Sequence, residues 1–316
     1  MSYKEKIDAI LARIEQTIVG KREISELSLT ALLAGGHVLL EDVPGVGKTV
    51  MVKSLAASIG AEFKRIQFTP DLLPSDVLGV SIYNPQQMEF EFRPGPIVGN
   101  IILADEINRT SPKTQAALLE GMEESSITID GKTLQLPQPF FVMATQNPIE
   151  YEGTYPLPEA QMDRFLFKLK MGYPTRDEEI EVLTRSDSQV SPELTAPAIA
   201  LEDLLELQVA VSNVIVDATV KSYIVDCATA TRNHASVYLG VSPRGSLGLM
   251  KACQAYALIN GRNYVTPDDV QYLLPYAFSH RIILHPDAEY SGHSIDDVLI
   301  DVLAKVRVPF VRANSV

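Results

Sequence analysis

Apolar residues in the first half of the chain follow two patterns, helical spacing and short unbroken runs. Helices are predicted where apolar residues recur every three or four positions, over residues 5–18, 27–33 and 49–58. Strands are predicted at apolar runs without alternation, over residues 37–40, 63–68, 100–104 and 140–144. Strands of this kind, separated by helices, are typical of a parallel sheet buried on both faces. The pattern therefore predicts an α/β fold.

Two segments alternate instead between apolar and polar residues, as β-hairpins do. They are residues 80–98 and residues 126–138, and the second turns at Asp130-Gly131, a strong hairpin signal. Hairpins that protrude from an α/β core often contact a partner. The alternative is that they cover the edges of the sheet, and the sequence does not decide between the two.

From Tyr173 onward the pattern is helical only, so we predict a domain boundary between residues 173 and 174. Residues 1–173 form the α/β nucleotide-binding core in this prediction, and residues 174–316 form an all-α domain. Thr266 and Ser294 are each followed by acids in a predicted first helical turn, which marks two helix starts.

Composition and charge narrow the class of protein. The chain has 316 residues, 46% hydrophobic and 21% charged, as folded globular proteins have. Its net charge of -13 disfavours nucleic acid as the main partner, because phosphate binding normally leaves a basic stripe. Cys227 and Cys253 are predicted to be reduced core residues. The N-terminus does not look like a signal peptide, and no apolar run approaches the roughly 20 residues of a membrane span, so we predict a cytoplasmic protein.

The stretch DVPGVGKT at residues 42–49 matches the phosphate-loop pattern GxxxxGK(S/T), with Asp42 in place of the first glycine. Such a loop points backbone N–H groups at phosphates at the start of a helix. Lys48 would reach the outer phosphates, and the hydroxyl of Thr49 would bind Mg²⁺. Asp42 tolerates a left-handed backbone, so the turn survives the substitution. The sequence thus predicts ATP and Mg²⁺ as cofactors.

Polar residues follow two of the predicted strands. Asp105 and Glu106 end the strand at 100–104, where a carboxylate suits Mg²⁺ and a second one suits activation of the attacking water. Asn147 follows the strand at 140–144 and would orient the same water. A solvated strand end explains one acid more easily than it explains two.

Two arginines also qualify as site residues. Arg164, in Asp163-Arg164-Phe165, would reach the γ-phosphate of a neighbouring subunit. Arg244 follows Ser242-Pro243 in a predicted first helical turn, where the helix dipole disfavours a cation, and this conflict suggests an anionic partner. For both residues the alternative is an ordinary ion pair.

Taken together and in this order, the motifs resemble those of AAA+ ATPases. The segments EDVPGVGKT, ILADEINRTSPKTQAALLEGMEE and MATQNPIEYEGTYPLPEAQMDRF are similar to the MoxR group, and the resemblance covers about residues 5–310. It implies a P-loop NTPase core with strand order 5-1-4-3-2 and an α-helical lid. It also implies one hairpin inserted in the second helix, matching 80–98, and a pre-sensor hairpin, matching 126–138.

The resemblance assigns a role to each predicted site residue. Asp105 and Glu106 become the Walker B pair, with Asn147 as sensor 1. Arg164 becomes the arginine finger and Arg244 sensor 2. The segment Ile18-Val19-Gly20 resembles the one that lines the adenine pocket, so the residues expected to contact ATP are Val19, Gly20, Pro44, Gly45, Val46, Gly47, Lys48, Thr49 and Val50.

By the same resemblance the protein hydrolyses ATP as a homo-oligomeric ring, a hexamer, and remodels proteins that contain von Willebrand A domains. One alternative is a helicase-like DNA translocase, which needs basic hairpin tips, whereas residues 80–98 offer Arg93 against Glu89 and Glu91. A second is a magnesium-chelatase motor subunit. A third is a module that binds ATP without turnover, against which Glu106 argues.

Overall fold

The computed structural model describes residues 1–41, 45–147, 154–187 and 196–309. Its centre is a five-stranded parallel sheet, whose strands in spatial order are β2 (Phe63–Gln67), β5 (Ile101–Asp105), β8 (Phe141–Gln146), β1 (Val38–Glu41) and β9 (Phe167–Leu169). Numbered along the chain among themselves, these strands have the order 2-3-4-1-5. The predicted parallel sheet and its 5-1-4-3-2 order are confirmed.

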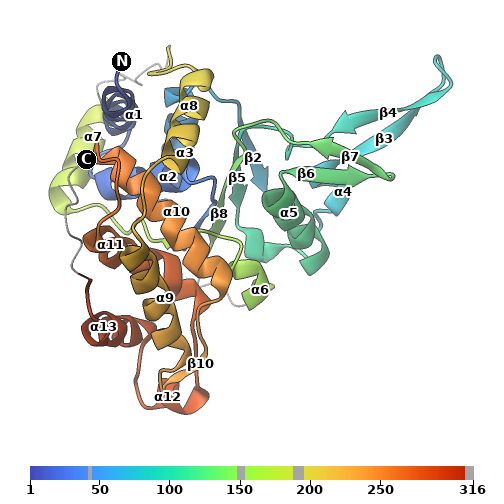
Figure 1. Cartoon of the computed structure of the whole chain (residues 1–316). Helices are drawn as coiled ribbons and strands as arrows, with labels where there is room; N and C mark the ends of the chain where they lie inside the picture. Colours follow the sequence, from blue (N-terminus) through green and yellow to red (C-terminus); the bar gives the residue numbers. More distant parts are fainter. Residues whose placement is uncertain (42–44, 148–153, 188–195, 310–316) are drawn as a thin grey trace.

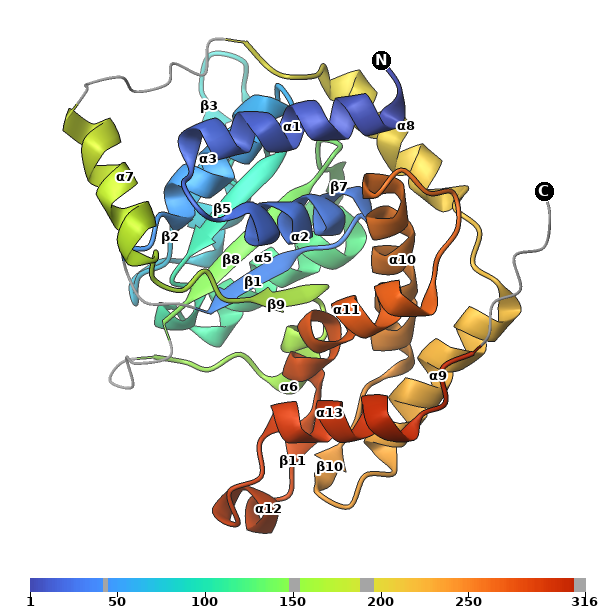
Figure 2. The same ribbon diagram turned by 90° about the vertical axis from the view of Figure 1, so that its left-hand side faces the viewer.

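Helices cover both faces of this sheet, which explains the unbroken apolar strands. On one face α1 (Tyr3–Thr17), α2 (Arg22–Leu33) and α3 (Lys48–Ser58) pack on side chains such as Val38 and Leu40. On the other face α5 (Pro112–Glu124) packs on Leu39 and its neighbours. Figure 2 shows α1 and α2 in front of the sheet and α5 behind it.

One buried histidine ties three of these elements together. The ring of His37, directly before β1, donates from Nε2 to the carbonyl oxygen of Met122 in α5 over 2.9 Å. Its Nδ1 accepts a 3.1 Å hydrogen bond from the backbone N–H of Val142 in β8. Burial lowers the pKa of His37 to about 4, so the ring is neutral near pH 7.

The C-terminal part is mainly helical (Figure 1). Its helices are α7 (Arg176–Asp187), α8 (Leu201–Ser212), α9 (Ala218–Arg232), α10 (Pro243–Ile259), α11 (Pro267–Phe278), α12 (Pro286–Tyr290) and α13 (Ile295–Lys305). Thr266 and Ser294 cap α11 and α13 through capping boxes, as predicted. No helix in the described ranges is long and apolar enough to cross a membrane.

The prediction of helices alone after residue 173 was wrong in one place. β10 (Val237–Leu239) and β11 (Ile283–Leu284) form a small antiparallel ribbon beside α12. Strands of three and two residues are too short to show an alternation of apolar and polar residues in the sequence. The two strands are also distant from each other along the chain. The domain boundary near Tyr173 remains a prediction.

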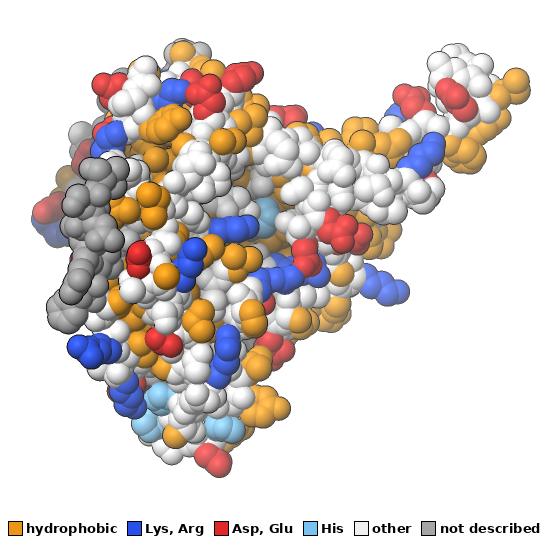
Figure 3. Space-filling view, viewed as in Figure 1, with side chains coloured by type: hydrophobic (Ala, Val, Ile, Leu, Met, Phe, Trp, Pro, Cys, Tyr) orange, Lys and Arg blue, Asp and Glu red, His pale blue; other side chains and the backbone are white. Residues whose placement is uncertain are grey.

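Both hairpins form, and each is a sheet of its own. β3 (Gly79–Asn84) pairs with β4 (Glu89–Pro94), and β6 (Ser126–Ile129) pairs with β7 (Lys132–Gln135). Neither pairs with the central sheet, so they do not cover its edges by strand pairing. The first hairpin stands away from the body as an arm that bears hydrophobic side chains (Figure 3), among them Ile82, Tyr83, Met88 and Phe90.

The first hairpin differs from expectation in its surroundings. It follows the short helix α4 (Pro74–Leu78) directly, and the chain then enters β5 through residues 95–100 without another helix. The hairpin therefore follows a helix and does not split one.

Candidate functional site

The carboxyl ends of β1, β5 and β8 meet at one edge of the sheet, where α/β proteins bind their ligands. A pocket of about 380 Å³ lies there, and it is lined by Gly45, Gly47, Lys48, Thr49, Val50, Arg65, Gln67, Asp105, Glu106, Thr145 and Asn147. The structure thus brings together eight of the predicted site residues, those of the phosphate loop and helix start with the two acids and Asn147.

The backbone of the loop leaves room for a ligand. Gly45 and Gly47 have φ values of +86° and +92°, which side-chain-bearing residues rarely adopt. Apart from the chain neighbours, nothing in the described part of the chain lies within 4 Å of a Cβ built on either glycine. Gly47 caps α3, so the free N–H groups of that helix start face an open cradle suited to phosphate. Pro44, predicted to contact ATP, lies outside the described residues.

Asp105 is held in place by neighbouring strands. Its Oδ1 accepts a 2.6 Å hydrogen bond from the hydroxyl of Thr145, which in turn accepts one of 2.8 Å from the backbone N–H of Glu106. Its Oδ2 lies 2.7 Å from Nη2 of Arg65. With the Thr49 hydroxyl in the same pocket, the carboxylate supplies the hard oxygen donors that Mg²⁺ prefers.

Glu106 has an unusual backbone conformation. Its φ and ψ of 58° and 49° are left-handed, which costs a non-glycine residue roughly 1 kcal/mol or more. Its Oε2 accepts hydrogen bonds from Gln67 over 2.9 Å and from Arg109 over 3.0 Å. Asn147 is almost fully buried, and its backbone carbonyl oxygen accepts a 3.4 Å hydrogen bond from the side-chain amide of Asn108. The strained turn and the two donors fix the Glu106 carboxylate at the pocket.

The sequence reasoning missed the polar residues that surround the two acids. Arg65 and Gln67 lie on β2, and Gln67 is in register with Asp105 on the neighbouring strand. Arg109 and Thr145 complete the set. The polar side chains of Arg65 and Gln67, within the predicted strand at 63–68, could have pointed to this set. Assigning them to the site required the knowledge that β2 and β5 are adjacent.

The two predicted site arginines lie elsewhere. Arg164 and Arg244 both pair with Glu123 at the end of α5, Arg164 through Nη2 and Oε2 at 2.9 Å and Arg244 through Nη2 and Oε1. They line a separate cavity of about 150 Å³, together with Lys251 and Arg281. Within one subunit, Arg164 and Arg244 therefore lie apart from the phosphate pocket, and their predicted roles toward a γ-phosphate remain predictions.

Three further predicted ATP contacts do not line the phosphate pocket. Val46 packs against the main hydrophobic core. A Cβ on Gly20 would lie 1.9 Å from a carboxylate oxygen of Glu178, so this backbone packs on the first turn of α7. Val19 precedes it, and the adenine-binding role of Val19 and Gly20 remains a prediction.

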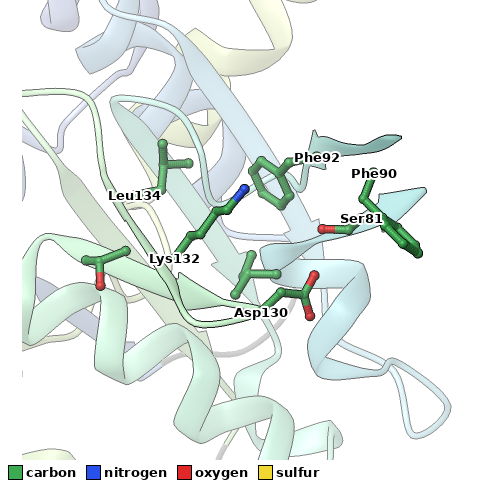
Figure 4. Close-up of a pocket in the computed structure, with 8 residues that line it drawn as sticks. Ser81, Phe90, Phe92, Asp130, Lys132 and Leu134 are labelled. Atoms are coloured by element: carbon green, nitrogen blue, oxygen red, sulfur yellow. The ribbon is translucent and has the colours of Figure 1, made fainter. Parts of the chain in front are cut away.

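A cavity of about 720 Å³ separates the two hairpins (Figure 4). Phe90 and Phe92 line it from the first hairpin, and Leu134 lines it from the second. The charged residues at this cavity are Asp130 and Lys132. Its wall is mainly apolar and its charges balance.

The strand order, the glycine cradle and the paired acids at a strand end define a P-loop ATPase of the AAA+ class. Residues 37–167 match the model of the "ATPase family associated with various cellular activities (AAA)", and residues 229–302 match the "AAA lid domain". The chain is 44% identical to the protein named Chaperone MoxR1 of Mycobacterium tuberculosis, over 97% of this chain and 83% of that one. It belongs to the MoxR family of AAA+ ATPases.

Other relatives match over most of their lengths. Protein MoxR of Paracoccus denitrificans is 30% identical over 94% of this chain and 95% of its own length. The uncharacterized protein YeaC of Bacillus subtilis is 62% identical over 99% of both chains. A solved structure from Cytophaga hutchinsonii has a TM-score of 0.91 at 38% identity, and the match covers 98% of this chain and 96% of that one.

Proposed function

We propose that the protein hydrolyses Mg·ATP as a homo-oligomeric ring, a hexamer, in which two subunits share each nucleotide site. The observation behind this proposal is the separation of the two charged centres. Lys48, Asp105 and Glu106 line one pocket, whereas Arg164 and Arg244 line another. A γ-phosphate in the first pocket then needs its outer cations from a second copy of the chain.

On the phosphate-loop side each residue has a distinct task. The loop and Lys48 bind the phosphates, and Thr49 with Asp105 would hold Mg²⁺, which supplies positive charge at the phosphate oxygens. Glu106 accepts the proton of the attacking water. Asn147, from the end of the neighbouring strand, orients that water.

At the arginine pair, the carboxylate of Glu123 lies where we expect the neighbour's γ-phosphate to bind. One carboxylate is shared by Arg164 and Arg244, so both guanidinium groups already converge on a single negative group. A γ-phosphate carries more charge and more acceptor oxygens than a carboxylate, and arginine forks bind it well. Both arginines would exchange Glu123 for the neighbour's phosphate, and there they would stabilise the transition state.

Dilution tests the shared site. Specific ATPase activity is measured from micromolar to nanomolar protein, with the mass of the particle followed by light scattering at the same concentrations. We expect activity and mass to fall together as rings dissociate. Activity that is constant while the protein becomes monomeric would contradict a shared site.

For the work that ATP drives, we propose remodelling of a protein client gripped by the two hairpins. The mainly apolar cavity between them suits side chains of a protein better than phosphates (Figure 4). The family resemblance suggests a client with a von Willebrand A domain. DNA should bind weakly at about 150 mM salt, where electrostatic contacts are attenuated. Sub-micromolar DNA affinity in that buffer would favour the helicase-like alternative.

A trapped form of the ATPase can identify the client. Glu106→Gln is expected to retain ATP and therefore the client, so proteins captured with it in ATP are compared with those captured by Lys48→Ala. Phe90→Ser added to the Glu106→Gln chain, which removes an exposed aromatic ring from the cavity wall while ATP is still retained, serves as the second comparison. We expect a von Willebrand A domain protein with Glu106→Gln alone. Equal capture by all three variants would contradict the proposal.

A further inference from the structure

The buried guanidinium of Arg281 joins the C-terminal helices to the core. Arg281 ends a short 3-10 turn after α11, and its side chain is only 4% exposed. Its Nε lies 2.6 Å from Oδ1 of Asp163. Its Nη2 donates to the carbonyl oxygens of Asp163 over 3.0 Å and Phe165 over 2.6 Å, and Nη1 donates to that of Leu166 over 3.2 Å. These hydrogen bonds hold the backbone on both sides of Arg164.

The same Asp163 carboxylate reaches the start of α10. Its Oδ2 accepts a 3.0 Å hydrogen bond from the hydroxyl of Ser242, which also caps α10 by accepting from the backbone N–H of Gly245. Arg244 lies in that first turn, between the cap and Gly245. One carboxylate therefore connects Arg281, the Arg164 segment and the Arg244 segment.

Packing at Gly245 reinforces this connection. A Cβ on Gly245 would lie 2.9 Å from Cδ and 3.2 Å from Nε of Arg281, and 2.5 Å from a methyl carbon of Val241. The first turn of α10 thus rests directly on the Arg281 side chain. Arg244 also lies near enough to contribute to lowering the pKa of Arg281, although burial is the larger cause.

We infer that Arg281 is a positioning residue, which holds Arg164 and Arg244 in one fixed arrangement so that they reach the neighbouring subunit's γ-phosphate together. Arg281 also lines the cavity of these two arginines, but its side chain is only 4% exposed and its guanidinium is already engaged by Asp163, Phe165 and Leu166, so we infer that it acts through the other two arginines. Since Arg281 lies among the C-terminal helices and Arg164 in the core, a movement of the one part would move both arginines. This inference rests on the proposed shared site.

The first test compares Arg281→Gln with Arg262→Gln. Arg262 also forms a half-buried bridge to an aspartate, Asp269, among the C-terminal helices, but neither residue lines the cavity of Arg164 and Arg244. We expect Arg281→Gln to lower kcat at least about tenfold, because a misplacement of about 1 Å can cost about 10²-fold. Nucleotide affinity should be unchanged, because the phosphate loop is untouched. Arg262→Gln should leave kcat unchanged, and equal kcat for both variants would overturn the inference.

Arg281→Lys tests whether the position of Arg164 depends on the set of hydrogen bonds that the Arg281 guanidinium donates. A lysine keeps the charge beside Asp163, but one ammonium group cannot reach the carbonyl oxygens of both Phe165 and Leu166 as the guanidinium fork does. We expect kcat to stay low in this variant. Full activity would show that charge alone suffices and would contradict the positioning role.

A combined variant separates this inference from the proposal on which it rests. In a chain that already has Arg164→Ala and Arg244→Ala, adding Arg281→Gln should lower kcat no further, because the residues through which it acts are gone. A further loss of the same size would show a different role for Arg281. If Arg164→Ala and Arg244→Ala each leave kcat unchanged, the shared site itself is wrong.

Ser242→Ala decides the matter if Arg281→Gln does not fold. Ser294→Ala is its matched control, because Ser294 caps α13 in the same way and far from Asp163 in sequence. We expect Ser242→Ala to lower kcat several-fold relative to Ser294→Ala with equal nucleotide affinity. Equal kcat in the two serine variants would overturn the inference.

Discussion

The phosphate pocket and the arginine cluster differ in how the fold builds them. Every described residue of the pocket lies between residues 45 and 147, on or directly after adjacent strands, in the phosphate loop or at the start of α3. The cluster joins Glu123, Arg164 and Arg244, which come from α5, the segment before β9 and α10. The pocket is a property of one sheet edge, whereas the cluster exists only where the C-terminal helices meet the core.

The charges of the two regions complement each other. In the pocket, Asp105 and Glu106 are balanced by Arg65 and Arg109 of the same chain. In the cluster, a single Glu123 faces two arginines. On our proposal the pocket binds the nucleotide by itself, and the cluster is suited to an additional anion. Binding and turnover should therefore respond to different substitutions.

The largest effect is expected from Arg164→Ala. Arginine fingers speed hydrolysis by roughly 10³–10⁵-fold, so we expect kcat to fall about 10³-fold or more while ATP binds nearly normally. Arg176→Ala is the control, because that arginine is 86% exposed and lines neither the phosphate pocket nor the cavity of Arg164 and Arg244. Single-turnover kinetics and fluorescent-nucleotide titration provide the two readouts. A loss of ATP affinity as large as the loss of kcat would place Arg164 in the binding pocket.

Glu106→Gln should have the next largest effect. A positioned general base contributes about 10²–10⁴-fold, so kcat should fall by at least about 10²-fold with ATP binding retained. Lys48→Ala should lose binding as well. Glu120→Gln, an exposed residue of α5, provides the matched control. Turnover equal to wild type in Glu106→Gln would remove this residue from the mechanism.

Acid should lower the free energy of unfolding, because the buried His37 connects the central sheet to α5. His37 has a pKa of about 4 when folded, below its ordinary 6.5, so the unfolded chain binds the proton first as pH falls. The stability that it contributes is complete above pH 6.5 and is lost as pH falls toward 4, by up to about 3 kcal/mol. His37→Gln can keep both hydrogen bonds without titrating. Denaturant unfolding should show a smaller loss in that variant between pH 7 and 4, and equal losses would contradict this account.

The smallest effect is expected from Glu123→Gln. Exposed ion pairs contribute at most about 1 kcal/mol, so kcat should change by less than about fivefold. The same carboxylate pairs with both arginines, yet its loss leaves them available to a phosphate. A loss of kcat comparable to that in Arg164→Ala would show that Glu123 itself takes part in the reaction.

The sequence predicted most of the pocket because its motifs are local. Lys48 and Thr49 follow a glycine loop, and Asp105 and Glu106 end an apolar run, so adjacent residues define their own surroundings. The cluster depends on contacts across more than a hundred residues, such as Arg244 with Glu123 and Arg281 with Asp163. No periodicity along the chain encodes those contacts.

The smaller features that the sequence did not predict also depend on contacts between distant segments. The ribbon of β10 and β11 consists of segments too short to show a period, and each forms only because the other is present. The contacts of Gln67 with Glu106 and Arg65 with Asp105 needed the strand order before they could be inferred. In each case the sequence alone did not show which distant segment packs beside the segment in question.

Mixing two inactive variants tests the shared site most directly. Arg164→Ala keeps an intact phosphate loop, and Lys48→Ala keeps an intact arginine cluster, so a mixed ring contains sites in which both halves are functional. We predict that equal amounts of the two recover ATPase activity that neither has alone, and that recovery requires conditions in which rings exchange subunits. A mixture of exchanged subunits with no more activity than the sum of its parts would contradict a nucleotide site divided between subunits.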